Sequence, residues 1–289
     1  MLSGFVPVVG RPNVGKSTLV NALVGSKVSI TSKRPQTTRN TIRGVLTRDE
    51  FQIVFVDTPG LHKPRTALGG RLNELVRGSL ADADVVLFVI DASAPVGPGD
   101  RRIAASLIEA DTPVVVAINK TDAASPAEIA SQLTVAAEWD LAAYVPVSAL
   151  DGDVPGIVDE LVSRLPEGPA YFPPDAVTDQ PDQFLAGEII REKFLDRLRD
   201  ELPHSLAVVV GDMEQRKNGM LYIPATLYVE RTSQKGIVIG KGAELLRQAG
   251  GDAREELRVL FGTEIYVDLT VKVEKDWQRR NATLDRFGF

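Results

Sequence analysis

The chain has 289 residues, 44% of them hydrophobic and 25% charged, a composition typical of a globular protein with room for two domains. It contains no cysteine, which excludes disulfides and thiolate chemistry, and its net charge of −6 excludes a general polycation for nucleic acid. Residues 1–10 lead straight into a strand without the features of a cleaved signal, and no apolar run reaches membrane-spanning length. We therefore expect a cytoplasmic protein.

A phosphate-binding loop is predicted between an apolar strand at residues 5–9 and a helix at residues 18–24. Residues 10–18 read Gly-Arg-Pro-Asn-Val-Gly-Lys-Ser-Thr, with two glycines, a lysine and a serine in the four fixed positions of such a loop. The glycines let backbone N–H groups surround a polyphosphate, Lys16 reaches the outer phosphates, and the Ser17 hydroxyl ligates magnesium. The nucleotide-binding candidates here are Asn13, Val14, Gly15, Lys16, Ser17 and Thr18.

Two segments with the features of nucleotide switches follow. Residues 29–41 form a polar loop placed where switches supply a threonine to magnesium, although a plain solvated loop has the same composition. After two alternating strands, at residues 41–47 and 52–56, Asp57 can hold magnesium through water, and the N–H of Gly60 can bind a terminal phosphate. Many switches next have a glutamine that orients water. Here that residue is a leucine, so another group has to position the water.

From residue 71 onward the sequence alternates between helical and strand periodicity. The strands are nearly continuous in valine, isoleucine and leucine, which indicates a parallel sheet covered by helices on both faces. Ligands bind at the carboxyl ends of the strands in such sheets. We predict helices at residues 71–80, 100–109, 126–139 and 154–165, and strands at residues 84–90, 112–118 and 143–147.

Two of these strand ends carry residues suited to reading guanine. Residues 119–122 read Asn-Lys-Thr-Asp, and the Asp122 carboxylate can accept from the ring N1–H and the 2-amino group, a donor pair that adenine lacks. Residues 148–150 read Ser-Ala-Leu and can offer a backbone N–H to the guanine O6. These segments predict GTP rather than ATP, with base-binding candidates Asn119, Lys120, Asp122, Ser148, Ala149 and Leu150.

A second domain is predicted beyond a boundary that contains five prolines between residues 165 and 183, because no helix or central strand accepts that density. An amphipathic helix at residues 184–202 precedes two strands, 206–216 and 221–231, whose connection contains Asn218-Gly219, a strong hairpin signal. A short apolar helix, a helix at residues 244–261 and a strand at residues 264–273 complete the order helix, strand, strand, helix, helix, strand.

The connection between the last two helices contains a glycine-lysine-glycine loop within residues 234–243, Gln-Lys-Gly-Ile-Val-Ile-Gly-Lys-Gly-Ala. A short apolar helix entering such a loop is the form in which KH domains clamp single-stranded RNA. The KH pattern is Gly-x-x-Gly, and this chain has Ala243 in the fourth place; an ordinary helix-turn-helix connection fits the loop equally well. The RNA-binding candidates are Lys235, Ile237, Ile239, Gly240, Lys241, Gly242, Ala243 and Arg247.

Two aromatic or imidazole side chains have open roles. Trp277, in a basic tail, either stacks on a base and extends an RNA track or anchors the tail by packing. His62, in the second switch, either orients water or is a surface residue. His204 follows a proline at a helix end, and we expect it to have a structural role.

Residues 3–165 resemble the GTP-binding domain of the translation-factor-related GTPases, because the phosphate loop, Asp57 to Gly60, Asn119 to Asp122 and Ser148 to Leu150 occur in order at strand ends. The full chain is similar to the Era family of bacterial GTPases, which adds Pro35-Gln36-Thr37-Thr38-Arg39, Leu61-His62 and the glycine-lysine-glycine loop. The resemblance implies an α/β fold, a P-loop GTPase with a doubly wound sheet, followed by an α+β type II KH domain. The implied division is a GTP-binding domain at 1–166, a proline-rich linker at 167–182, a KH domain at 183–276 and a basic tail at 277–289.

The resemblance also implies a function: slow GTP hydrolysis and assembly of the small (30S) ribosomal subunit, with the KH domain holding the 3′ end of small-subunit rRNA. It implies GTP or GDP and Mg²⁺ as cofactors, with K⁺ near Asn13 partly replacing the missing glutamine. A monomer is expected, in the cytoplasm or peripherally at the inner membrane face. The implied magnesium ligands are Ser17, Asp57 and Thr38, with Thr37 as the alternative to Thr38, and the implied catalytic residues are Lys16, Thr38 and Gly60.

Two other classes of function compete with this interpretation. A metabolic phosphotransferase is disfavoured by the guanine-reading segment at residues 119–122. A signalling switch acting on a protein or membrane partner would need the second domain to be an adaptor. The loop at residues 240–243 distinguishes this class from an RNA-binding assembly factor, because only for the assembly factor should Lys241→Asp abolish binding of RNA.

Overall fold

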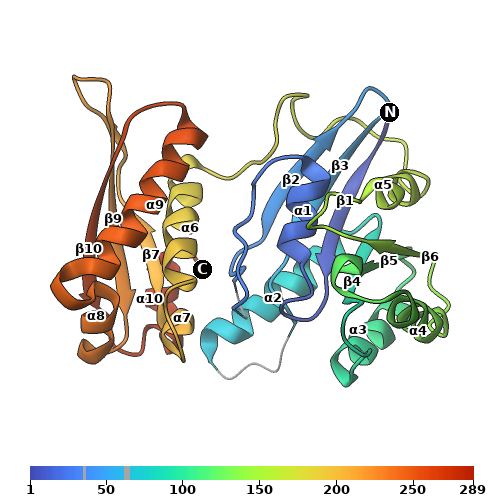
Figure 1. Ribbon diagram of the computed structural model, residues 1–289. Coiled ribbons are helices and arrows are strands. Elements are labelled where there is room, and N and C mark those ends of the chain that lie inside the picture. Colours follow the sequence, from blue (N-terminus) through green and yellow to red (C-terminus); the bar gives the residue numbers. More distant parts are fainter. Residues whose placement is uncertain (35–36, 62–65) are drawn as a thin grey trace. The chain divides into compact units, whose positions relative to one another are not determined.

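The computed structural model describes residues 1–34, 37–61 and 66–289, and the chain divides into two compact units (Figure 1). The first unit contains most of residues 1–179. The second contains residues 180–289 together with two short segments of the earlier chain, whose described residues are 30–34, 37 and 66–68. Among the described residues, no helix is both long and apolar enough to cross a membrane.

The first unit is built on a six-stranded sheet, counted over the described residues, in the order β2-β3-β1-β4-β5-β6. The strands from residue 71 onward pair in parallel, as predicted, and so do β1 and β3, but the sheet as a whole is mixed because β2 runs antiparallel to β3. Only residues 48–50 connect these two strands, and so short a link forms a hairpin rather than a crossover. The strands are β1 (Leu2–Val9), β2 (Ile42–Thr47), β3 (Phe51–Asp57), β4 (Val86–Asp91), β5 (Val114–Asn119) and β6 (Ala143–Val147).

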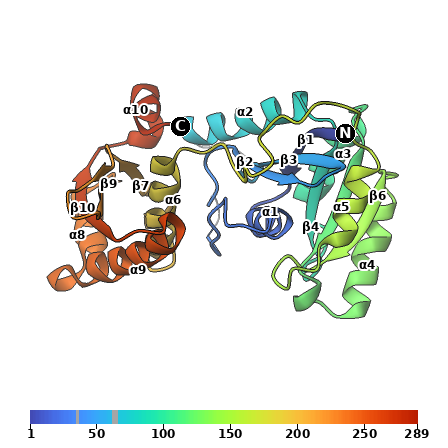
Figure 2. The same ribbon diagram turned by 90° about the horizontal axis from the view of Figure 1, so that it is seen from above.

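Helices cover both faces of this sheet, which confirms the doubly wound arrangement. Helices α1 (Lys16–Val24) and α5 (Pro155–Val162) pack on one face through a cluster of buried apolar side chains. Helices α2 (Ala67–Ala81), α3 (Pro98–Ile108) and α4 (Pro126–Ala137) cover the other face, so that strands lie between α1 and α2 (Figure 2). The carboxyl ends of β1, β3, β4, β5 and β6 therefore remain open at one edge for a ligand.

The proline-rich segment after α5 lies along the first unit. Ser3 donates its hydroxyl to the carbonyl of Pro169 at 2.8 Å, and the Gln52 side chain donates to the carbonyl of Phe172 at 2.9 Å. Farther along, Arg43 and Asp179 form an ion pair at 2.6 Å. Residues 167–179 are therefore fixed by side-chain hydrogen bonds and isolated backbone bridges rather than by a helix or a central strand, which their prolines would disrupt.

The second unit combines a four-stranded sheet with helices, counted over the described residues. β9 (Leu221–Val229) lies at its centre and pairs antiparallel with β7 (Ala207–Val210) and β8 (Glu214–Gln215), as the predicted hairpin requires, and parallel with β10 (Ile265–Val273). The predicted helix at 184–202 ends earlier. The helices are α6 (Asp182–Leu195), α7 (Leu202–Ser205), α8 (Thr232–Ile239), α9 (Glu244–Phe261) and α10 (Asn281–Phe287).

Strand periodicity sets the two faces of this second sheet. Alternate residues of β9, from Ile223 to Val229, are buried under α6, α8 and α9, as expected for a strand with one face in the core. Helix α10 lies on the opposite side of the sheet from α9 (Figure 2), where the rings of Phe287 and Tyr228 are 4.4 Å apart. The C-terminal residues thus fold onto the sheet.

Trp277 anchors this C-terminal segment. Its side chain is fully buried, its ring stacks on Phe289 at 5.6 Å, and its indole N–H donates to the carbonyl of Ser205 at 2.9 Å. The ring is therefore packed and is not available to stack on a base. Two arginines of the predicted basic tail, Arg280 and Arg286, form ion pairs with Glu274, which reduces the positive charge expected there.

We expect Trp277→Ala to lower the free energy of unfolding by about 3–5 kcal/mol, because it opens a cavity between the sheet and the C-terminal segment. Trp277→Phe should cost less, since it keeps an aromatic ring and removes mainly the hydrogen bond. Urea unfolding followed by circular dichroism measures both variants. An unchanged midpoint for Trp277→Ala would contradict the anchoring role.

Candidate functional site

The phosphate loop between β1 and α1 depends on two glycines. Gly10 has φ +155°, and a Cβ there would lie 2.4 Å from the carbonyl oxygen of Val89. Gly15 has φ +96°, and a Cβ there would lie 2.3 Å from the side-chain nitrogen of Asn119. Any other residue at either position would therefore collide with a neighbouring strand end. Asn13 adopts the left-handed region at φ 66°, which asparagine tolerates better than most residues.

Lys16 begins α1 and is buried behind this loop. Its ammonium group donates to the carbonyls of Gly10 at 3.2 Å and Arg11 at 3.0 Å. Burial lowers the pKa of Lys16 to about 8, and the negative charge of Asp57 opposes that effect. Within the described part of the chain, the ammonium is hydrogen-bonded only to these uncharged carbonyl oxygens. A polyphosphate would give this buried positive charge an anionic partner.

Three oxygen-bearing side chains converge beside Lys16. The Ser17 hydroxyl donates to Asp57 Oδ2 at 2.7 Å and lies 2.9 Å from the hydroxyl of Thr38, which lies 3.3 Å from the same carboxylate oxygen. Thr37 instead donates its hydroxyl to the carbonyl of Arg34 at 2.7 Å. Of the two threonines left open by the sequence, Thr38 is therefore the one that lies at the site.

This cluster fits a magnesium ion. Asp57 is fully buried, and burial raises its pKa although the hydrogen bond from Ser17 and the charge of Lys16 oppose the rise. Its Oδ1 is buried without a hydrogen-bond partner among the described residues, which leaves that oxygen able to accept from or coordinate a ligand. Hydroxyl and carboxylate oxygens are the donors that Mg²⁺ prefers, with water and phosphate completing its shell.

The second switch begins against the phosphate loop. Gly60 is buried and packs on Pro12, where a Cβ would lie 2.8 Å from the proline nitrogen. The N–H of Leu61 donates to the carbonyl of Gly10 at 3.4 Å, and the leucine side chain packs against the apolar cluster under α3 and α4. The side chain of Leu61 thus takes no part in polar chemistry. His62, Pro35 and Gln36 lie outside the described residues.

The guanine-reading segments meet at the ends of β5 and β6. Asn119 donates its amide to the carbonyl of Val14 at 2.9 Å, and its Oδ1 accepts the N–H of Ala149 at 3.0 Å. Ser148 donates its hydroxyl to Asp122 Oδ1 at 2.8 Å, which orients that carboxylate. The two segments, distant in sequence, therefore form one site that adjoins the phosphate loop, with Leu150 exposed at its rim.

The sequence prediction missed one member of this site, Asp91 at the end of β4. Lys120 donates to Asp91 Oδ2 at 2.5 Å and to the carbonyl of Asn13 at 2.8 Å, so the lysine bridges β4 and the phosphate loop. Burial acts to raise the pKa of Asp91, but hydrogen bonds from Lys120 and Ser93 outweigh it and lower the pKa. The available signal was an aspartate directly after the apolar run at residues 85–90.

The candidate RNA loop in the second unit has an irregular backbone. Gly240, Gly242 and Ala243 have φ values of 77°, 58° and 60°, so Ala243 adopts the left-handed region that glycine favours. Arg247, on the first turns of α9, donates to the carbonyls of Gly242 at 2.9 Å and Ala243 at 3.4 Å. Arg247 therefore holds the loop carbonyls from the α9 side.

Exposure separates the predicted RNA-binding side chains into two groups. Lys241 is exposed, and Ile237 is 53% exposed, which is unusual for an isoleucine and makes it available to an apolar ligand. Ile239 is only half-buried and packs against the core of the second unit, while Lys235 is half-exposed on α8.

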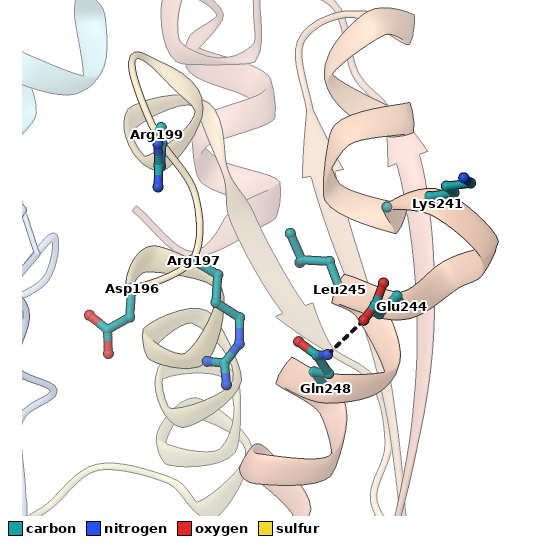
Figure 3. Close-up of a pocket in the computed structure, with 8 residues that line it drawn as sticks. Asp196, Arg197, Arg199, Lys241, Glu244, Leu245 and Gln248 are labelled. Atoms are coloured by element: carbon teal, nitrogen blue, oxygen red, sulfur yellow. Dashed lines mark hydrogen bonds between the residues drawn. The ribbon is translucent and has the colours of Figure 1, made fainter.

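A hollow of about 400 Å³ lies on the α6 side of this loop (Figure 3). Leu245 and Gln248 line the hollow from α9, and Gln248 donates to Glu244 at 3.1 Å. The lining residues are Asp196, Arg197, Arg199, Gly240, Lys241, Glu244, Leu245 and Gln248. The loop is therefore accessible from this side as well as from α8.

Comparison with protein families finds two matching models. Residues 5–120 match the family described as 50S ribosome-binding GTPase, and residues 201–278 match the KH domain. Among curated proteins, the GTPase Era of Mycobacterium tuberculosis (strain ATCC 25618 / H37Rv) is 52% identical over 99% of this chain and 98% of its own length. The GTPase Era of Mycobacterium avium (strain 104) is 51% identical over the same shares of the two chains.

Two solved structures agree with these relatives. Aquifex aeolicus Era bound to GDP and aluminium fluoride matches with a TM-score of 0.96 and 40% identity, over 100% of this chain and 99% of that chain. An Era protein in complex with MgGDPNP and nucleotides 1506–1542 of 16S ribosomal RNA matches with a TM-score of 0.95 and the same identity and coverage.

The pKa of Lys16 generates a pH prediction. Phosphates raise the pKa of a neighbouring ammonium, so binding GDP requires Lys16 to be protonated, and the free protein begins to lose that proton at about pH 8. We expect GDP affinity to be flat below that pH and to fall above it, by up to about tenfold per pH unit.

Isothermal titration between pH 7 and 9 in EDTA measures this dependence. Lys16→Arg serves as the matched variant, because a guanidinium stays charged over the range and also reports any effect of the guanine base itself. Equal slopes for both proteins would contradict the assignment to Lys16.

Proposed function

This chain belongs to the Era family of GTPases, and on that premise we propose that it is a GTP-controlled RNA-binding protein that assists assembly of the small ribosomal subunit. GTP hydrolysis is its enzymatic activity. The observation that supports the proposal is the presence, in one chain, of the converging Ser17 and Asp57 side chains, the Asn119 to Ala149 contact between the two guanine-reading segments, and a KH domain. Hydrolysis would reset a state that binds RNA.

In the proposed nucleotide complex, the Lys16 ammonium would bind the outer phosphates while it keeps its two hydrogen bonds to loop carbonyls. Ser17, Thr38 and Asp57 would hold magnesium, and the buried Oδ1 of Asp57, which has no hydrogen-bond partner among the described residues, supports this. The ion would neutralise charge on the phosphates. The N–H of Gly60 binds the terminal phosphate, and Asp122, oriented by its hydrogen bond from a serine, binds the base.

The proposed catalytic residues are Lys16, Thr38 and Gly60. With Leu61 packed into the apolar cluster, charge in the transition state has to be stabilised by another group. We assign part of that role to K⁺ held near Asn13, whose left-handed backbone turns the loop at the phosphates and whose carbonyl is fixed by Lys120.

For the RNA, we propose the 3′ end of small-subunit rRNA, the region represented in the solved Era complex. Lys241 supplies charge to a phosphate, Gly240 and Gly242 permit close approach of the RNA backbone, and Ile237 contacts a base. Lys235 and Ile239 belong to the same helix and complete the surface on that side. Arg247 acts indirectly, by holding the loop carbonyls.

We further propose a monomer that acts in the cytoplasm, where its ribosomal partner is, with the inner membrane face as an alternative peripheral site. The proposed domains are residues 1–166 for GTP, 167–182 as linker, 183–276 for RNA and 277–289 as tail. The ion pairs of Glu274 with two tail arginines support a tail that stabilises the second unit more than it binds RNA.

We expect the full chain to bind single-stranded RNA of the rRNA 3′ end more tightly with MgGDPNP than with MgGDP at one fixed salt concentration. Lys241→Asp should abolish this binding in both nucleotide states, because it replaces the loop's cation with an anion beside a phosphate. Fluorescence anisotropy of labelled RNA measures the affinities.

The matched control is Lys217→Asp, which makes the same change of charge on the hairpin turn. That turn adjoins the C-terminal end of α9, since Thr263 donates to the carbonyl of Gly219 at 3.1 Å, and the 18 residues of α9 separate it from the loop by about 27 Å. Equal affinity of wild type and Lys241→Asp would overturn the RNA assignment and favour a switch acting on a protein partner.

Exchange of K⁺ for Na⁺ should slow GTP hydrolysis by up to ~100-fold, the typical effect of losing one preorganised electrostatic contact. Asn13→Ala should lower the rate in K⁺ and remove the difference between the two ions, while Asn218→Ala, on the hairpin turn of the second unit, serves as the control. Phosphate release under single-turnover conditions measures the rates. Identical rates in both ions would rule out the potassium role.

A further inference from the structure

An ion pair outside the sites described above links the phosphate loop to the first turn of α3. Arg11, the second residue of the loop, donates its Nε–H to Asp100 Oδ1 at 2.7 Å. The side chain of Asp100 is 1% exposed, whereas that of Arg11 is 33% exposed. The pair joins two segments that are 89 positions apart in the sequence.

Both oxygens of Asp100 are engaged. Oδ2 accepts the backbone N–H of Gly97 at 2.9 Å, which begins α3, and Oδ1 accepts from Arg11. Removing the partner of a buried carboxylate leaves a charge without compensation, which is strongly unfavourable. The buried carboxylate therefore holds the Arg11 guanidinium firmly in place.

The aliphatic part of Arg11 is fixed as well. A Cβ on Gly99 would lie 2.6 Å from Cδ and 3.2 Å from Cγ of Arg11, so the arginine side chain lies directly on the backbone of α3. A side chain at position 99 would displace it. Arg11 is thus held both by charge at its end and by packing along its length.

The same residue contributes its backbone to the nucleotide site. The carbonyl of Arg11 accepts from the ammonium of Lys16 at 3.0 Å, and Pro12, the next residue, packs against Gly60. Movement of Arg11 would therefore shift the phosphate loop relative to both the lysine and the second switch.

We propose that Arg11 and Asp100 form a latch that positions the phosphate loop and sets the rate at which guanine nucleotide dissociates. Neither side chain is a catalytic residue, because both act through the loop backbone. The inference rests on the guanine-nucleotide site proposed above and extends control of nucleotide release to the first turn of α3.

Two conservative variants test the latch. Arg11→Met keeps the aliphatic contact with Gly99 and removes the charge, and Asp100→Asn keeps an acceptor for the Gly97 N–H and removes the charge. The experiment measures dissociation of a fluorescent GDP analogue from the full chain, chased with excess GDP in Mg²⁺. Each variant should release the analogue roughly tenfold faster than wild type.

The double variant distinguishes a latch from two independent effects. If the residues act as one unit, Arg11→Met/Asp100→Asn should dissociate no faster than the faster single variant. Glu160→Gln, which breaks the 2.6 Å pair with Arg164 in the same unit, is the matched control and should leave the rate unchanged.

Three outcomes would overturn the latch. Dissociation rates equal to wild type in both single variants, with or without a lower melting temperature, would make the pair purely structural, and multiplicative effects in the double variant would show no coupling. Asp100→Asn keeps the test valid if Arg11→Met does not fold. A wild-type chain that does not bind the analogue at all would overturn the proposed function and the latch together, an outcome distinct from the other two.

Discussion

The nucleotide site depends on hydrogen bonds that occupy the carbonyl oxygens of the phosphate loop. A carbonyl and the next N–H of a trans peptide point in opposite directions, so fixing the carbonyls on the protein side turns the following N–H groups toward the ligand. The bonds are those of Lys120 to Asn13 at 2.8 Å, of Asn119 to Val14 at 2.9 Å, and of Lys16 to Gly10 and Arg11 at 3.2 and 3.0 Å. These bonds shape the loop into an anion cradle with the protein's own groups.

The same side chains connect recognition of the base to the phosphates. Asn119 binds the phosphate loop with its amide nitrogen and the Ala149 N–H with its oxygen, so one residue fixes both halves of the site. Lys120 does the same between the loop and Asp91. Asn119 and Lys120 can affect the affinity for the nucleotide without touching it. Displacing either side chain would rotate the phosphate-loop peptide groups that face the nucleotide. Specificity for guanine and strength of phosphate binding are therefore not separable properties here.

Local sequence predicted the groups that chemistry requires, but not their long-range partners. The phosphate loop and the guanine-reading segments followed from residue types at strand ends, and the fold class followed from hydrophobic periodicity together with the family resemblance. The Asp91 bridge and the Arg11 to Asp100 pair depend on contacts between distant segments, which periodicity does not encode. The antiparallel β2 follows instead from the short link at residues 48–50. Trp277 shows the same limit, since a tryptophan in a basic tail fits stacking or packing until Ser205 and the facing rings are known.

The RNA loop combines a residue in an unfavourable backbone conformation with hydrogen bonds that hold that conformation. Ala243 occupies a left-handed conformation that costs an alanine about 1 kcal/mol relative to glycine, and two hydrogen bonds from Arg247 to the loop carbonyls oppose relaxation of that backbone. Lys241 and Arg247 are both exposed, so both present positive charge to solvent beside the loop. In a chain of net charge −6, long-range attraction for RNA is weak, so the proposed binding has to come from this short, preorganised contact. A loop held in one conformation loses less entropy on binding.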